Sequence, residues 1–130
     1  MNFKLNTIII FVKNVEKLKS FYADILGLKI VEEIKSEWLL LNAGSCNIGL
    51  HKAGSDFSES GINEYKSFSN TKIVFEIEED ILKVRDRLVK AKVKMREIKT
   101  FDNYEYIVCD GEDPEGNVFQ IKQRKLSAGD

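Results

Sequence analysis

Cysteine, proline and histidine are scarce in this chain of 130 residues, which has two cysteines, one proline and one histidine. Cys46 and Cys109 stand alone rather than in a Cys-x-x-Cys pair. The sequence therefore predicts neither a zinc cluster nor a disulfide framework, and we expect both cysteines to be buried, reduced thiols.

Long apolar runs and a strong charge of one sign are also missing. No apolar run approaches the roughly 20 residues that a membrane span needs. The formal net charge is −1, which gives no cationic field for binding a phosphate backbone. Residues 1–6 lack the apolar region and cleavage site of a signal peptide. We therefore expect a cytoplasmic protein that contacts neither nucleic acid nor a membrane.

The composition, with 43% hydrophobic and 32% charged residues, is that of an ordinary globular protein. The length suits one domain with one core. We expect that single domain to span 1–130.

The stretch 111–122 has the most specific local pattern. Asp113, Pro114 and Gly116 favour a type I turn, because an aspartate bonds nearby backbone, proline presets φ and glycine suits the fourth position. The residues that follow alternate between the two faces of a strand, with Asn117, Phe119 and Ile121 on one face and Val118, Gln120 and Lys122 on the other. If a helix covers the apolar face, Gln120 can line a cavity on the opposite side.

The rest of the chain predicts two runs of elements. The first is a strand at 7–12, expected to be buried on both faces, an amphipathic helix between an Asn14 cap and Gly27, and extended segments from 28, at 38–41 and at 47–51. The second is a strand at 72–77, a helix opened by the acidic residues 78–80, and strands at 93–98, 104–109 and 117–122.

Both runs follow the order strand, helix, strand, strand, strand. The sequence therefore predicts two copies of one βαβββ unit in an α+β fold. Their expected bounds are about 5–51 and 71–123, with a connector at about 52–70. A helix on one side of each curved sheet leaves the opposite, concave side free to form a cup.

Two motifs carry a family resemblance. They are Phe-Tyr-x-x-x-Leu-Gly-Leu at 21–28 and Asp-Pro-x-Gly-Asn at 113–117. With these motifs the chain resembles the vicinal oxygen chelate superfamily, which includes glyoxalases, extradiol dioxygenases, fosfomycin-modifying transferases and bleomycin-resistance proteins. The resemblance implies a half-open, eight-stranded, barrel-like sheet with helices on its convex side, commonly in a homodimer.

The metal enzymes of that superfamily hold a divalent ion with His, Gln or Glu at four places. The resemblance puts Thr7, Gly49, Lys72 and Gln120 at those places. Threonine is a poor ligand, glycine has no side chain, and an ammonium repels a cation. A single amide oxygen cannot hold a metal, so we expect no metal ion and no cofactor.

Several side chains are candidates for lining the cup: Phe11, Trp38, His51, Lys72, Glu76 and Gln120. Phe11 and Trp38, with Tyr104 and Tyr106, could form an aromatic wall for a flat or cationic ligand, although core packing is the commoner fate of such residues.

Three of these candidates have two interpretations each. His51 is either a general base or metal ligand, or an inert polar residue at a strand end. Glu76 is either a buried carboxylate with a shifted pKa or a screened partner of a neighbouring cation. A displaced metal site of His51, Glu76 and Gln120 is also conceivable.

The sequence thus predicts a metal-free protein that sequesters a small organic ligand, as the bleomycin-resistance type does. The alternatives are a metal-dependent lyase, isomerase or dioxygenase with displaced ligands, an enzyme that uses His51 or Glu76 as base, and a subunit with a vestigial cup.

Overall fold

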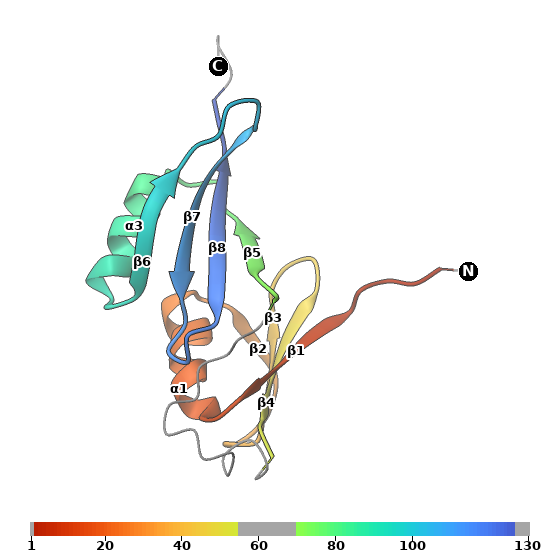
Figure 1. Ribbon diagram of the computed structural model, residues 1–130. Helices are drawn as coiled ribbons and strands as arrows, with labels where there is room; N and C mark the ends of the chain where they lie inside the picture. Colours follow the sequence, from red (N-terminus) through yellow and green to blue (C-terminus); the bar gives the residue numbers. More distant parts are fainter. Residues whose placement is uncertain (1, 55–69, 127–130) are drawn as a thin grey trace. The chain divides into compact units, whose positions relative to one another are not determined.

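The structure is a computed structural model, and it describes residues 2–54 and 70–126 (Figure 1). The chain divides into two compact units, residues 1–66 and 67–130. Most of the connector expected at 52–70 lies outside the described residues. The single-domain organisation stays a prediction.

The first unit contains a four-stranded mixed sheet. Its elements are β1 (Thr7–Val12), α1 (Val15–Lys19), the π-helix η1 (Ser20–Ile25), β2 (Lys29–Ile34), β3 (Trp38–Asn42) and β4 (Asn47–Lys52). The strand order is β1-β4-β3-β2. The edge strand β1 pairs with β4 in parallel, and the other two pairings are antiparallel.

The first helical segment begins and ends where the sequence predicts. Asn14 Oδ1 accepts a hydrogen bond from the Lys17 amide at 3.0 Å, and Gly27 has a φ of +79°. The difference is that the helix widens in its second half, where the Leu26 amide reaches the Phe21 carbonyl five residues back. Phe21 and Tyr22 are both buried in this wider segment.

One face of the first sheet forms the core with the helical segment. Val12, Leu18, Leu39, Leu41 and Leu50 are completely buried there. The expectation that β1 is buried on both faces is wrong, because alternate side chains of β1 remain open: Ile9 is 47% exposed and Phe11 51%. The first sheet therefore has one covered and one open face.

The second unit repeats the architecture of the first. Its elements are β5 (Ile73–Glu76), α3 (Ile81–Lys90), β6 (Lys94–Lys99), β7 (Tyr106–Glu112) and β8 (Val118–Arg124). The strand order β5-β8-β7-β6 again pairs the first strand with the last in parallel. The predicted βαβββ repeat and the α+β fold class are confirmed.

The helix α3 lies along one face of the second sheet (Figure 1). Asp80 caps it by accepting from the Leu82 amide at 3.1 Å, and the Ile81 amide donates to Gln123 Oε1 of β8 at 2.8 Å. The core beneath α3 includes Ile81, Leu88, Val93, Cys109, Phe119 and Ile121. Among the described residues, no helix is long and apolar enough to cross a membrane.

The two cysteines differ in their surroundings. Cys109 is buried, and its Sγ donates to the Arg96 carbonyl at 3.2 Å. Burial raises the pKa of the Cys109 thiol. Cys46 is half-buried. The expected buried thiol is therefore confirmed for Cys109, whereas Cys46 is less covered than expected.

The turn between β7 and β8 is built around one carboxylate, as the sequence predicts. The Gly116 amide donates to the Asp113 carbonyl at 2.9 Å. Asp113 Oδ1 accepts from the Glu115 and Asn117 amides, each at 2.9 Å, and Oδ2 accepts from Asn117 Nδ2 at 2.8 Å. These bonds satisfy a side chain that is only 4% exposed and fix the start of β8.

Candidate functional site

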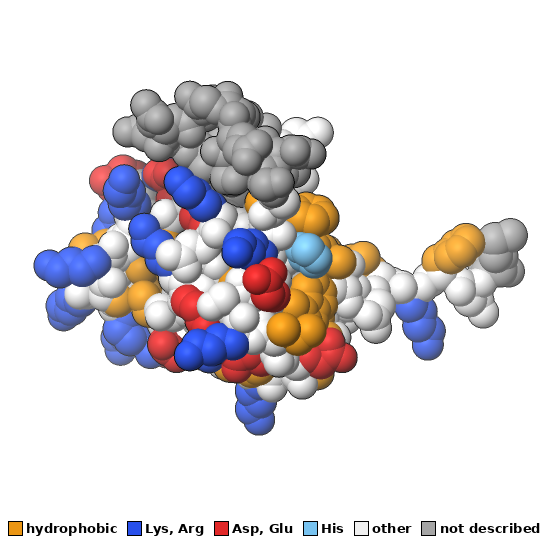
Figure 2. Space-filling view, turned by 90° about the horizontal axis from the view of Figure 1, so that it is seen from below, with side chains coloured by type: hydrophobic (Ala, Val, Ile, Leu, Met, Phe, Trp, Pro, Cys, Tyr) orange, Lys and Arg blue, Asp and Glu red, His pale blue; other side chains and the backbone are white. Residues whose placement is uncertain are grey.

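The face of the first sheet that points away from α1 and η1 carries a row of three aromatic rings. In the strand register, Phe11 and Trp38 both lie opposite His51. The His51 ring centroid is 5.4 Å from that of Phe11 and 6.0 Å from that of Trp38. Figure 2 shows the histidine bordered by hydrophobic side chains. We call this row, with its three residues, the aromatic row.

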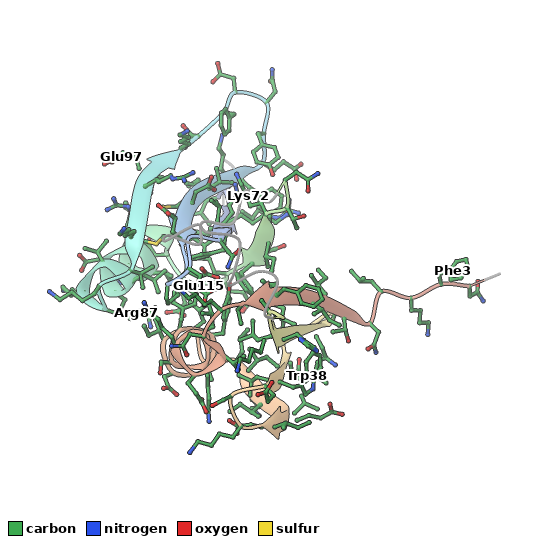
Figure 3. The ribbon with its side chains drawn as sticks, turned by 60° about the horizontal axis from the view of Figure 1, so that its bottom comes forward. Phe3, Trp38, Lys72, Arg87, Glu97 and Glu115 are labelled. Carbon is green, nitrogen blue, oxygen red and sulfur yellow. The ribbon has the colours of Figure 1, made fainter. Side chains whose placement is uncertain are left out.

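Trp38, labelled in Figure 3, makes two close contacts on its own sheet. Its indole Nε1 donates to Glu32 Oε2 on the neighbouring strand at 3.1 Å. Its ring lies over Gly49, such that a Cβ at position 49 would be 2.5 Å from Cη2 and 2.9 Å from Cζ3 of the indole. The tryptophan ring therefore fills the space that a side chain at position 49 would need.

The corresponding face of the second sheet carries a polar cluster centred on Asp110. Lys72 Nζ is 2.8 Å from Asp110 Oδ2, and Gln120 Nε2 donates to Oδ1 at 2.9 Å. Arg96 Nη1 lies 3.8 Å from Oδ2. We call these four residues the Asp110 cluster. It joins Lys72 and Gln120, two of the predicted site residues.

The surroundings of Asp110 keep its carboxylate ionised. Burial is the largest single influence and raises the pKa of Asp110. The hydrogen bonds from Lys72 and Gln120 and the charges of Lys72 and Arg96 act in the opposite direction and leave the pKa below its ordinary value. The cluster therefore favours the charged form of Asp110.

This lowered pKa predicts a pH dependence of stability for Asp110→Asn. Because the folded pKa lies below the unfolded value of about 3.9, the ionised carboxylate stabilises the folded state above that pH. The stabilisation is lost as the pH falls through the folded pKa. The stability gap between the native protein and Asp110→Asn should thus be constant near neutral pH and shrink below about pH 4, as measured by urea unfolding at several pH values. A gap that widens in acid would contradict the assignment.

Glu76 is not the buried carboxylate that one of its two interpretations expects. Its side chain is exposed, and no ion pair or hydrogen bond joins it to the part of the chain that the structure describes. Lys72, the nearby cation, pairs with Asp110 and not with Glu76. The partly buried carboxylate of this face is Asp110, and a lining role for Glu76 stays a prediction.

The aromatic wall expected from four residues is divided between the units. Phe11 and Trp38 belong to the aromatic row of the first. In the second, the Tyr104 and Tyr106 rings are 5.6 Å apart, and Lys122 Nζ lies 4.0 Å above the Tyr106 ring. The tyrosines are therefore engaged with each other and with a cation.

Sequence reasoning missed Asp110 and Arg96. The predicted strand ended at 109, whereas β7 continues to Glu112 and pairs Asp110 with Gln120. Extending the alternation by one residue would have placed Asp110 on the Gln120 face. Arg96 carried no such signal, because β6 has an irregular register between Met95 and Ile98.

Three of the four places to which the resemblance assigns metal ligands do not suit a metal ion here. Gly49 lies beneath the Trp38 ring, the Lys72 ammonium is paired with Asp110, and the Gln120 amide nitrogen donates to the same carboxylate. The described residues include no group of three His, Cys, Asp or Glu side chains that could hold a metal ion. We therefore derive no chemistry through a metal.

Comparison with known proteins agrees with this architecture. The sequence profile of the Glyoxalase/Bleomycin resistance protein/Dioxygenase superfamily matches residues 4–121. The chain belongs to this superfamily. No curated protein sequence matches it significantly. The superfamily resemblance seen in the two motifs is thus confirmed over nearly the whole chain.

Solved structures of superfamily type share the fold. A lactoylglutathione lyase from Agrobacterium tumefaciens has a TM-score of 0.73 at 12% identity, with 94% of each chain covered. The fosfomycin resistance protein FosX from Listeria monocytogenes has a TM-score of 0.69 at 15% identity, covering 97% of this chain and 95% of its own. A virulence protein from Salmonella typhimurium has a TM-score of 0.71 at 21% identity, covering 96% and 98%. At these identities the likeness shows the fold alone.

Proposed function

We propose that this member of the superfamily binds a small organic molecule without the help of a metal ion. The observation that carries the proposal is that Gly49, Lys72 and Gln120 are all committed to other interactions. A metal-binding side chain in place of Gly49 would displace the Trp38 ring. A cation beside Lys72 would meet a charge of its own sign.

The exposed side chains of the first sheet support a binding role over a purely structural one. Phe11 is 51% exposed and Ile9 47%, and Trp38 is held in a fixed position by Glu32. An aromatic surface that is held rigid loses little conformational freedom when a flat ligand stacks on it. We expect a homodimer, as the superfamily resemblance implies, and we expect it to capture its ligand in the cytoplasm.

The test of this function has a metal arm and a ligand arm. The purified protein should contain no stoichiometric Ni, Zn, Fe or Mn, and added metal should leave the melting temperature unchanged. The probe for the ligand arm is 8-anilinonaphthalene-1-sulfonate. Trp38 is the only tryptophan, so energy transfer from tryptophan to the dye reports that the dye is bound, and the following variants locate the binding.

Phe11→Ala should weaken binding of the dye by about tenfold, a loss of about 1.4 kcal/mol, because it removes a stacking surface. Phe101→Ala is the matched control, since Phe101 is 53% exposed and lies in the second unit. Equal effects of the two substitutions would contradict binding at the aromatic row. Tight uptake of one metal ion per chain would overturn the metal-free function in favour of a metal-dependent lyase, isomerase or dioxygenase.

A further inference from the structure

We infer that the Asp110 cluster binds an oxyanion group, a carboxylate or a phosphonate, of a small organic ligand. This deepens the proposed function, the metal-free binding of a small organic molecule, by naming a ligand class. It rests on that function, and it does not require one ligand to contact both the Asp110 cluster and the aromatic row. The cluster lies on the face of the second sheet that points away from α3, as the pairing of Asp110 with Gln120 shows.

The first argument is charge. The Lys72 and Arg96 nitrogens converge on one oxygen, Asp110 Oδ2, at 2.8 and 3.8 Å. One carboxylate faces two permanent cations, so the group has an excess of one positive charge. An oxyanion is the ligand group that would neutralise this excess.

The second argument is accessibility. The Lys72 and Arg96 side chains are 43% and 52% exposed, whereas that of Asp110 is only 19% exposed. An ammonium has three donors and a guanidinium has five, so both cations keep donors beyond those directed at Asp110. A ligand approaching this face therefore meets the cations before it meets the carboxylate.

The third argument is rigidity. Asp110 Oδ1 accepts from Gln120 while Oδ2 faces Lys72, so both carboxylate oxygens have partners. The carboxylate in turn holds the Lys72 ammonium at one position. A cation that is already ordered loses less freedom when it binds a ligand.

The other charged groups of this face do not remove the excess. Glu76 lies opposite Lys122 in the strand register, and Lys122 Nζ lies over the Tyr106 ring. Glu112 likewise lies opposite Lys94. Among the described residues neither Glu76 nor Glu112 forms an ion pair with Lys72 or Arg96, whose ion pairs go to Asp110, so the excess charge remains at these two cations.

The experiment is a titration of the native protein with four probes that share a phenyl ring, followed by backbone-amide NMR. The probes are benzoate, phenylphosphonate, benzyl alcohol and benzyltrimethylammonium. We expect the two anions to bind at least tenfold more tightly than the alcohol and the cation, with shifts at the amides of β7 and β8. The ratio between benzoate and phenylphosphonate tells which oxyanion the cluster prefers.

A pair of variants locates the charge that is responsible. Lys72→Met should weaken benzoate binding by about tenfold, the effect of one lost charge-assisted hydrogen bond. Lys90→Met removes the same charge from α3, on the other side of the sheet, where Lys90 is 76% exposed and pairs with Asp86. It should leave benzoate binding unchanged. If Lys72→Met fails to fold, the ranking of the four probes on the native protein still tests whether the Asp110 cluster binds an oxyanion.

Equal binding of all four probes, or equal losses in the two variants, would overturn the oxyanion site. That outcome leaves the proposed function standing, because dye binding at the aromatic row and the metal arm are measured separately. Conversely, a bound metal would remove the proposed function whatever the ranking of the probes.

Discussion

Replacing Asp113 with alanine is expected to lower the free energy of unfolding by about 2 to 4 kcal/mol, because it leaves buried donors without partners. Asp113 accepts from two backbone amides and from the Asn117 side chain at distances of 2.8 to 2.9 Å. Its side chain is almost fully covered, so water cannot replace these bonds. Urea unfolding of the variant against the native protein measures the loss.

Two further substitutions decide whether hydrogen bonding is the cause. Asp113→Asn retains one acceptor oxygen and should lose less than the alanine variant. Asp102→Ala changes an exposed aspartate in another turn and should stay within about 0.5 kcal/mol of the native protein. A loss at Asp113 no larger than that at Asp102 would show that the turn does not depend on this carboxylate.

Gly111→Ala is expected to destabilise the protein by about 1 to 3 kcal/mol, since extra volume in a packed core forces neighbours out of position. A Cβ at position 111 would lie 2.8 Å from Cζ and 2.9 Å from Cε1 of Phe119, and 2.5 Å from Sδ of Met95. The methionine can move, but the Phe119 ring is buried to 1% exposure. Urea unfolding again supplies the measurement.

Gly54→Ala is the matched control, because no atom of the described residues lies within 4 Å of a Cβ at that position and its backbone does not need a positive φ. It should leave the stability nearly unchanged. Combining Gly111→Ala with Phe119→Leu, which frees space beside position 111, should cost less than the two single changes added together. Strict additivity would mean that Phe119 is not the obstacle.

Local signals in the sequence were sufficient to predict the helices and strands of the fold. Asn14 and Gly27 mark the ends of the first helical segment, and Asp113 with Pro114 marks the last hairpin. These signals are reliable because each depends on the bonding or φ preference of a residue within its own turn. The repeat of the element order then led to two βαβββ units, and the superfamily motifs led to the same fold.

The candidate site was predictable only in part. The alternation of β8 put Gln120 opposite the helix-covered face, and the structure confirms that position through its bond to Asp110. The same reasoning named no partner for Lys72. A strand end that was placed too early hid Asp110, and element ends are the least certain part of any prediction from sequence.

The sequence alone determined the superfamily and the two βαβββ repeats, and it led to the expectation that Thr7, Gly49 and Lys72 hold no metal ion. These features depend on residue identity and on spacing along the chain. Only the tertiary structure decided that Trp38 covers Gly49 and that Asp110 holds Lys72, Gln120 and Arg96 together. Such contacts join side chains that are 38 positions apart in the case of Lys72 and Asp110, and strand register, which sets them, is a property of the folded sheet.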